Sequence, residues 1–327
     1  MLRHPQQHGG SGASPGPLPP RAFRARFLRR DSSSAYNLCM LSPIGVVAVF
    51  LVFLGAGPAG AAVKVTVTPS AVRQGDVAFM VVTGVAAAPE MDGSLAGRPL
   101  FFFPYADGYA ALIGIDLEAK PGKTPWRLRF VDGTGAPRKV AGAITVKARK
   151  FPVQRLSLPK SMVDLSPEDE RRANAESARL RTLFDTVGPE RLWRGPFTKP
   201  VATDAKAEGF GSRRIINGRL RSPHSGLDFA APAGTPVVAS NRGRVALVVE
   251  FFFGGRLVAL DHGEGLYTLY MHLDRADVVE GTLVERGSMI GAVGSTGRAT
   301  GPHLHWGAHL HSARIDPDAL LKLPVRD

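Results

Sequence analysis

The sequence has almost no cysteine and no long apolar run, and each absence excludes a class of protein. The single cysteine, Cys39, excludes an intramolecular disulfide and a cysteine-rich zinc finger, so any metal site must be built from His, Asp or Glu. The apolar run Val46–Leu54 is far shorter than the about 20 residues that a membrane-spanning helix needs. The chain also lacks a phosphate-cradling glycine loop, a nucleic-acid-binding motif, an HExxH helix and an internal repeat. We therefore expect no nucleic-acid partner.

Length and charge set broad limits. A chain of 327 residues with 44% hydrophobic and 21% charged residues is long enough for about two folded domains. Its net charge is +13. Residues 1–62 hold six Arg and one Asp, or +5, which leaves +8 for the remainder. A basic remainder suits an anionic partner such as cell-wall polymer or nucleic acid, although scattered cations are also typical of an ordinary solvated surface.

Residues 1–62 resemble a leader. The first twenty are rich in Pro, Gly, Gln and Ser, which predicts disorder. The basic stretch "RAFRARFLRR" precedes the apolar run, and the small residues "GAGPAGAA" follow it. This order is typical of a secretory signal, with cleavage expected near Ala61–Ala62. The alternative is an uncleaved membrane anchor. Either way we expect export to the periplasm or cell envelope.

The rest of the chain divides into a β module, a connector and a second β domain. Stretches such as "VKVTVTP" and "WRLRF" alternate apolar and polar residues, and turn signals separate them, so residues 63–150 predict an immunoglobulin-like β-sandwich. Residues 151–194 form a linker with a helix over 166–185, which Ser166 can cap. Residues 195–323 read as an all-β domain of short strands. The predicted fold class is therefore mostly β.

Two short motifs carry the chemistry in the second β domain, which holds seven of the nine histidines. In "HSGLD", His224 and Asp228 are four residues apart in a stretch that is expected to be extended, so both side chains share a face. In "HLH", His303 and His305 share a face, while Leu304 points into a core. Each motif alone is a weak signal, and a histidine pair is often ordinary strand content. Imidazole and carboxylate aimed the same way are nevertheless two of the ligand types of catalytic zinc.

With an isolated "YMH" ending at His272, these motifs make residues 209–318 resemble the lysostaphin-like (LytM-type) zinc peptidoglycan endopeptidases. The resemblance is carried by "GFGSR", "HSGLDFAAPAGTPVVA", "LDHGEGLYTLYMHL" and "RGSMIGAVGSTGRATGPHLHWGA", in family order. It implies an antiparallel sheet groove and a Zn²⁺ ion held by His224, Asp228 and His305. It further implies catalytic roles for His303 and His272.

The division of work between the two implied catalytic histidines stays open. Three protein ligands and one open place are the pattern of a catalytic zinc ion, which activates water and polarises a carbonyl. A proton acceptor is also needed, and neutral imidazole can serve. We expect His303 to be the general base, and His272 to orient the water or to stabilise the developing oxyanion. The two roles could be exchanged.

Other residues near these motifs have two readings each. His309 and His311 belong either to exposed strand ends or to the surroundings of the site. His262 is expected to be structural, and Arg213 to hold a loop rather than to meet substrate. The stretch "EFFFGG" predicts a hairpin whose phenylalanines wall a substrate groove or pack in a core. The loop "TGRATGPH" predicts a tight turn that also lets a peptide approach the metal.

The expected function is hydrolysis of the peptide stems that cross-link bacterial peptidoglycan. The alternative is a non-cutting protein of the same fold that binds peptidoglycan or activates another hydrolase. The sequence leaves open the bond that is cleaved, the oligomeric state, and whether a regulatory protein partner relieves a block on the site.

Overall fold

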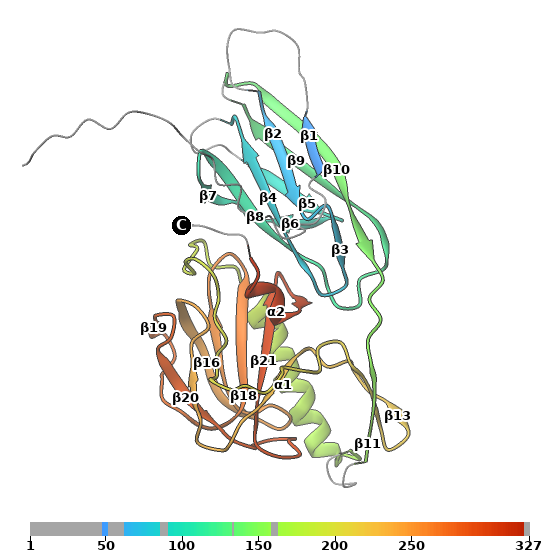
Figure 1. Ribbon diagram of the computed structural model, residues 1–327, viewed down its shortest axis with the longest axis vertical. Helices are drawn as coiled ribbons and strands as arrows, with labels where there is room; N and C mark the ends of the chain where they lie inside the picture. The colour runs from blue at the N-terminus through green and yellow to red at the C-terminus, as the bar shows by residue number, and fades with distance from the viewer. Residues whose placement is uncertain (1–47, 52–61, 86–90, 133, 158–162, 324–327) are drawn as a thin grey trace, which may run out of the picture. The chain divides into compact units, whose positions relative to one another are not determined.

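The computed structural model describes residues 48–51, 62–85, 91–132, 134–157 and 163–323. Most of the expected leader and its cleavage position, just before Ala62, lie outside the described residues. The described chain is mostly β, as predicted, with two helices (Figure 1). No helix in these ranges is both long and apolar enough to cross a membrane.

Two five-stranded sheets make up the N-terminal part. The first has the order β1-β2-β4-β8-β7, with strands at Ala48–Leu51, Lys64–Thr68, Val77–Thr83, Gly108–Gly114 and Phe103–Tyr105. The second has the order β3-β10-β9-β5-β6, with strands at Ala71–Arg73, Pro137–Lys147, Gly122–Val131, Asp92–Leu95 and Arg98–Leu100. Val65 and Val67 of the first sheet share one core with Trp126 and Leu128 of the second, as the period-two pattern predicts. The immunoglobulin-like character of this sandwich stays a prediction.

The connector contributes a strand and a helix. Strand β11 (Val153–Leu156) pairs in parallel with β12 (Arg213–Ile216), which forms a hairpin with β13 (Arg219–Leu220). Helix α1 spans Pro167–Asp185, and the Ser166 hydroxyl caps it by accepting from the Asp169 N–H at 3.0 Å. The helix thus begins and ends within a residue of its predicted bounds.

The C-terminal part is one antiparallel sheet. Its main path is β14-β21-β18-β17-β16-β19, and these strands span Gly226–Ala230, His303–Leu310, Leu266–Ala276, Gly255–Asp261, Gly243–Phe251 and Leu283–Val284. Strands β15 (Pro236–Val238), β20 (Met289–Val293) and β22 (Ala313–Ile315) pair off this path, and helix α2 (Pro317–Leu320) follows. Figure 1 shows β16, β18 and β21 as long strands of this sheet.

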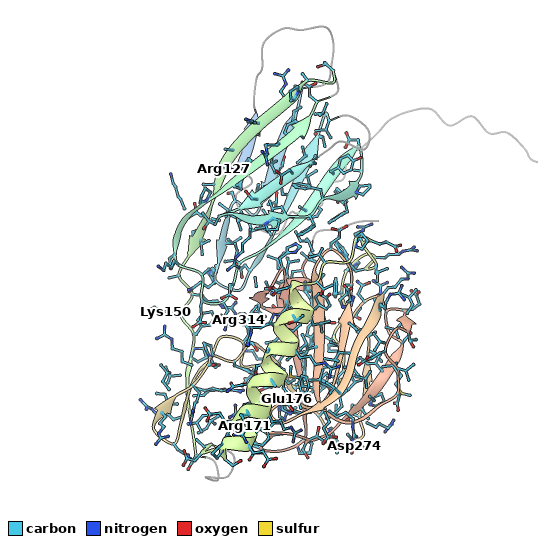
Figure 2. The ribbon with its side chains drawn as sticks, turned by 180° about the vertical axis from the view of Figure 1, so that it is seen from behind. Arg127, Lys150, Arg171, Glu176, Asp274 and Arg314 are labelled. Atoms are coloured by element: carbon cyan, nitrogen blue, oxygen red, sulfur yellow. The ribbon has the colours of Figure 1, made fainter. Side chains whose placement is uncertain are left out.

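The two faces of the sheet have different neighbours. Leu304 and Trp306 lie in the core on one face. On the other face, Tyr267 and Leu269 pack with Phe184 of helix α1. Glu176 of the same helix (labelled in Figure 2) accepts a hydrogen bond from the backbone N–H of Phe252 at 2.8 Å. Helix α1 therefore covers part of the face to which the odd-numbered residues of β21 belong.

Residues of the sandwich also contact the C-terminal sheet within residues 44–327, which form one compact unit. Phe103 and Leu112 belong to one core cluster with Trp193 and Leu310. Arg314, labelled in Figure 2, donates to both carboxylate oxygens of Asp116, at 2.8 and 3.1 Å. A shared apolar cluster and a bidentate ion pair stabilise this contact.

Candidate metal centre

Two neighbouring strands bring the "HSGLD" and "HLH" motifs together. Strand β14 pairs antiparallel with β21, and Asp228 lies directly opposite His305 in this register. His224 precedes β14 and is fixed by its backbone N–H, which donates to the Ser212 carbonyl at 3.0 Å. The pairing therefore joins side chains from motifs that lie far apart in the sequence.

The three side chains converge on one point. His224 Nε2 lies 3.0 Å from Asp228 Oδ1 and 2.8 Å from His305 Nδ1. His305 Nδ1 lies 2.9 Å from the same Asp228 oxygen. Both histidines are buried, and one ligand atom from each of the three residues falls within 4.8 Å of the others. Two imidazole nitrogens and one carboxylate oxygen are a donor set that zinc accepts in catalytic sites, so these residues fit the ion.

Two glycines make room for the ligand rings. A Cβ at Gly226 would lie 2.6 Å from His305 Nε2, and one at Gly209 would lie 2.3 Å from His224 Nδ1. Gly209 also has a φ of +107°, which side chains rarely adopt. Both contacts are far closer than real side chains allow, so glycine at these positions lets the rings face one another.

Burial of His224 and hydrogen bonding to Asp228 favour the forms of these two side chains that can coordinate a metal. Burial lowers the pKa of His224 to about 4 from 6.5, although the hydrogen bond with Asp228 acts the other way. Burial acts to raise the pKa of Asp228, but the hydrogen bonds from His224 and His305 outweigh it and keep that pKa below its ordinary value. Neutral imidazole and ionised carboxylate are the forms that coordinate a metal.

His272 and His303 lie beside the ligands, and both are oriented by a backbone carbonyl. His303 Nδ1 donates to Gly301 O at 2.8 Å, and His272 Nδ1 donates to Thr296 O at 2.8 Å. Because a carbonyl only accepts, each Nδ1 carries a proton, and in the neutral form of either ring Nε2 is the atom that can accept one. The two ring centroids are 4.7 Å apart, and His303 Nε2 lies 3.9 Å from Asp228 Oδ1.

Backbone geometry and burial set His272 apart from its neighbours. It has a φ of +62° within β18, and its N–H donates to the Gly254 carbonyl at 2.9 Å. A positive φ is uncommon for a residue with a side chain and often marks a functional position. Burial, with a smaller contribution from the neighbouring His305, lowers its pKa to about 4. His272 is therefore neutral at physiological pH.

The other histidines of the cluster pack on aromatic rings. His309 stacks on Phe184 of helix α1 with ring centroids 3.8 Å apart, and His311 stacks on Phe101 at 4.8 Å. Both side chains are partly buried, so the reading of exposed strand ends is wrong. His262 is fully buried, with its two ring nitrogens 2.8 Å from Arg242 O and 2.7 Å from Thr268 Oγ1. These contacts give the three histidines packing roles.

We expect His309→Phe to make stability less sensitive to acid. Burial lowers the pKa of His309 from 6.5 to about 3. As the pH falls below 6.5, His309 becomes protonated in the unfolded chain but stays neutral in the folded protein. The contribution of His309 to stability is therefore fully present above pH 6.5 and is lost on acidification. Between about pH 6 and pH 4, the free energy of unfolding should therefore fall less steeply in the variant than in the wild-type protein. The difference in slope should be up to about 1 kcal/mol per pH unit.

Urea unfolding of both proteins, without metal, measures this difference. Glu264, whose pKa burial raises to about 7, acts in the opposite sense but is common to both proteins and cancels. Equal pH slopes for the two proteins would contradict the lowered pKa of His309.

A pocket next to the ligands contains residues that the motifs did not single out. Among others, its lining includes His224, His272 and His305 together with Arg214, Phe253 and Arg298. Arg213, the arginine named from the sequence, is exposed and outside this lining, while its backbone N–H donates to Pro152 O at 2.9 Å. Phe253 lines the pocket, which agrees with the prediction that phenylalanines of the "EFFFGG" hairpin form one wall of a substrate groove. Arg298 could have been identified from the sequence, because it lies inside the glycine-rich loop that precedes "HLH".

Comparison with known proteins places this centre in a family. The model of peptidase family M23 matches residues 222–317, which include His224, Asp228 and His305 together with His272 and His303. A crystal structure described as peptidase M23 from Pseudomonas aeruginosa is 32% identical, over 76% of this chain and 94% of that chain, with a TM-score of 0.59.

Two curated relatives come from Vibrio cholerae. Peptidoglycan DD-endopeptidase ShyA is 46% identical over 102 residues, which are 31% of this chain and 24% of ShyA. Peptidoglycan DD-endopeptidase ShyB is 39% identical over 110 residues, which are 33% of this chain and 26% of ShyB. The chain thus spans about a quarter of the length of these relatives.

Proposed function

Because the chain belongs to peptidase family M23, we propose that it is an exported zinc metalloendopeptidase that hydrolyses the peptide cross-links of bacterial peptidoglycan. The observation that carries the proposal is the convergence of His224, Asp228 and His305 beside two histidines that backbone carbonyls orient. Relatives named as peptidoglycan DD-endopeptidases support the substrate class.

The five side chains divide into ligands and proton acceptors. His224, Asp228 and His305 would hold a zinc ion, which supplies Lewis acidity to a water molecule and to the scissile carbonyl. We assign His303 as the general base because its free Nε2 lies 3.9 Å from a ligand oxygen. His272, whose Nε2 is also free, would orient the water by accepting a hydrogen bond from it.

The residue that accepts the water proton can later return it. Peptide hydrolysis requires a proton on the departing amine, and protonated His303 is placed to donate one. The hydrogen bond from Nδ1 to Gly301 O keeps the ring in one orientation through both transfers. Orientation by a second hydrogen bond is the usual way in which proteins fix a histidine tautomer.

Digestion of purified peptidoglycan by the full chain tests the proposal. We expect zinc-loaded protein to release peptides with new amino and carboxyl ends, and a chelator to stop their release. The masses of the products would identify the bond. If zinc-loaded protein sediments with peptidoglycan and releases nothing, the proposal fails in favour of a non-cutting binding protein.

A further inference from the structure

Three arginines gather around the pocket beside the metal ligands. Arg214 lies on β12, Arg221 follows β13, and Arg298 lies in the loop between β20 and β21. Arg214 and Arg298 line the pocket, whose described lining contains no Asp or Glu. We call these three residues the arginine cluster.

The positive charges of the cluster are poorly compensated. Burial, then the charges of Arg214 and Arg221, lowers the pKa of Arg298, so both of these arginines lie near enough for their charges to act on Arg298. Arg298 forms no ion pair with any residue that the structure describes. Arg214 Nη2 lies 3.5 Å from Asp228 Oδ2, and its buried Nε has no hydrogen-bond partner in the described part of the chain. Among the described residues, the carboxylate that pairs with the cluster is Asp228, a proposed metal ligand whose charge a zinc ion would share.

Arg298 is held in place before any substrate arrives. Its backbone N–H donates to Phe253 O at 3.0 Å, and its guanidinium lies 4.0 Å from the centre of the Phe253 ring. A guanidinium stacked on an aromatic ring keeps its planar set of donors free for a carboxylate. The arginine cluster thus presents oriented, partly desolvated donors next to the reaction centre.

We propose that Arg298, assisted by Arg214, binds a free carboxylate on the carbon next to the scissile nitrogen of the substrate. This inference rests on the proposed function. The residue on the carbonyl side of the scissile bond uses its α-carboxyl group to form that bond, so this group is not a free carboxylate. The nearest free α-carboxylate therefore belongs to the residue that supplies the leaving amine. Arg214 touches a ligand carboxylate, so a carboxylate bound here must lie close to the scissile bond.

The proposal selects one class of cross-link. In a link through a diamino-dicarboxylic acid, the amide nitrogen and a free carboxylate share one carbon. In a link through the ε-amine of lysine or through a terminal glycine of an amidated bridge, that carboxylate is absent. Charge-assisted hydrogen bonds are strong enough to discriminate between these links by about 10- to 100-fold.

A matched pair of synthetic peptides tests the proposal. Both contain a D-alanyl link to the amine of diaminopimelate, and the adjacent group is a carboxylate in one peptide and a carboxamide in the other. We expect wild-type protein to cleave the carboxylate peptide with a kcat/KM about 10- to 100-fold higher. Arg298→Gln should erase that preference by slowing the carboxylate peptide alone, and Arg298→Lys should restore part of it.

Arg219→Gln is the matched control, since Arg219 is an exposed arginine of the β12–β13 hairpin, which also carries Arg214, and it pairs with Asp164 instead of lining the pocket. It should leave the preference unchanged. Zinc content should be equal in all variants. Calorimetry on zinc-loaded His303→Ala protein gives a second measurement, in which the carboxylate peptide should bind more tightly and Arg298→Gln should remove the difference.

Equal cleavage of both peptides by wild-type protein, or a wild-type preference in Arg298→Gln, would overturn the role of the cluster while leaving the proposed function intact. If neither peptide is cleaved, the proposed function fails for this link. Calorimetry then decides the inference alone, and equal binding of the two peptides would reject it.

Discussion

His305→Ala is expected to bind no zinc at equimolar concentration and to release no peptide from peptidoglycan. The imidazole of His305 lies within 3 Å of both His224 Nε2 and Asp228 Oδ1, so its removal leaves two ligands where a catalytic zinc ion needs three. The loss of the metal removes both the activation of water and the polarisation of the carbonyl. Metal analysis of the purified protein and digestion with added zinc measure the two effects separately.

His311→Ala is the matched control because it removes an imidazole from the same histidine-rich stretch. His311 stacks on Phe101 and lies outside the ligand set, so this variant should keep its zinc and its activity. Retention of stoichiometric zinc by His305→Ala would show that the ion is held elsewhere. Digestion that persists without zinc would reject a metal-dependent mechanism.

The sequence allows the local geometry of the centre to be predicted well. In β21 the period of two places His303 and His305 on one face and Leu304 in the opposite core, as the structure has them. Helix α1 follows equally from local signals, because its capping residue and its acidic first turn are adjacent in the sequence. Such features depend on neighbours a few residues apart.

What could not be predicted depends on long-range pairing. The register that sets Asp228 opposite His305 joins residues 77 positions apart, and no local pattern specifies it. Arg214 and Arg298 meet at the pocket only because β12 is held by β11 and the loop after β20 is held by Phe253. The aromatic stacking of His309 requires the packing of helix α1 on the sheet. Period-two patterning gives the face of a strand but not its neighbour.

The second large effect is expected for His303→Ala, which should keep its zinc yet cleave peptidoglycan about 100- to 10,000-fold more slowly, the usual worth of a general base. The reason is that His303 Nε2 lies 3.9 Å from Asp228 Oδ1, where it could accept the proton of a water, while its Nδ1 donates to Gly301 O. Turnover numbers from single peptide substrates, measured beside the zinc content of the same samples, test this expectation.

His272→Ala separates the roles of the two histidines, because it too should keep its zinc but should lose less activity. Both Nε2 atoms are free, so the larger fall identifies the base, and a larger fall for His272→Ala would exchange the roles. Added imidazole sharpens the comparison, because a small base can enter the space left by a deleted ring. Rescue of His303→Ala together with no rescue of His305→Ala would distinguish loss of a proton acceptor from loss of a ligand. A His303→Ala protein that cleaves at the wild-type rate would exclude His303 from the reaction.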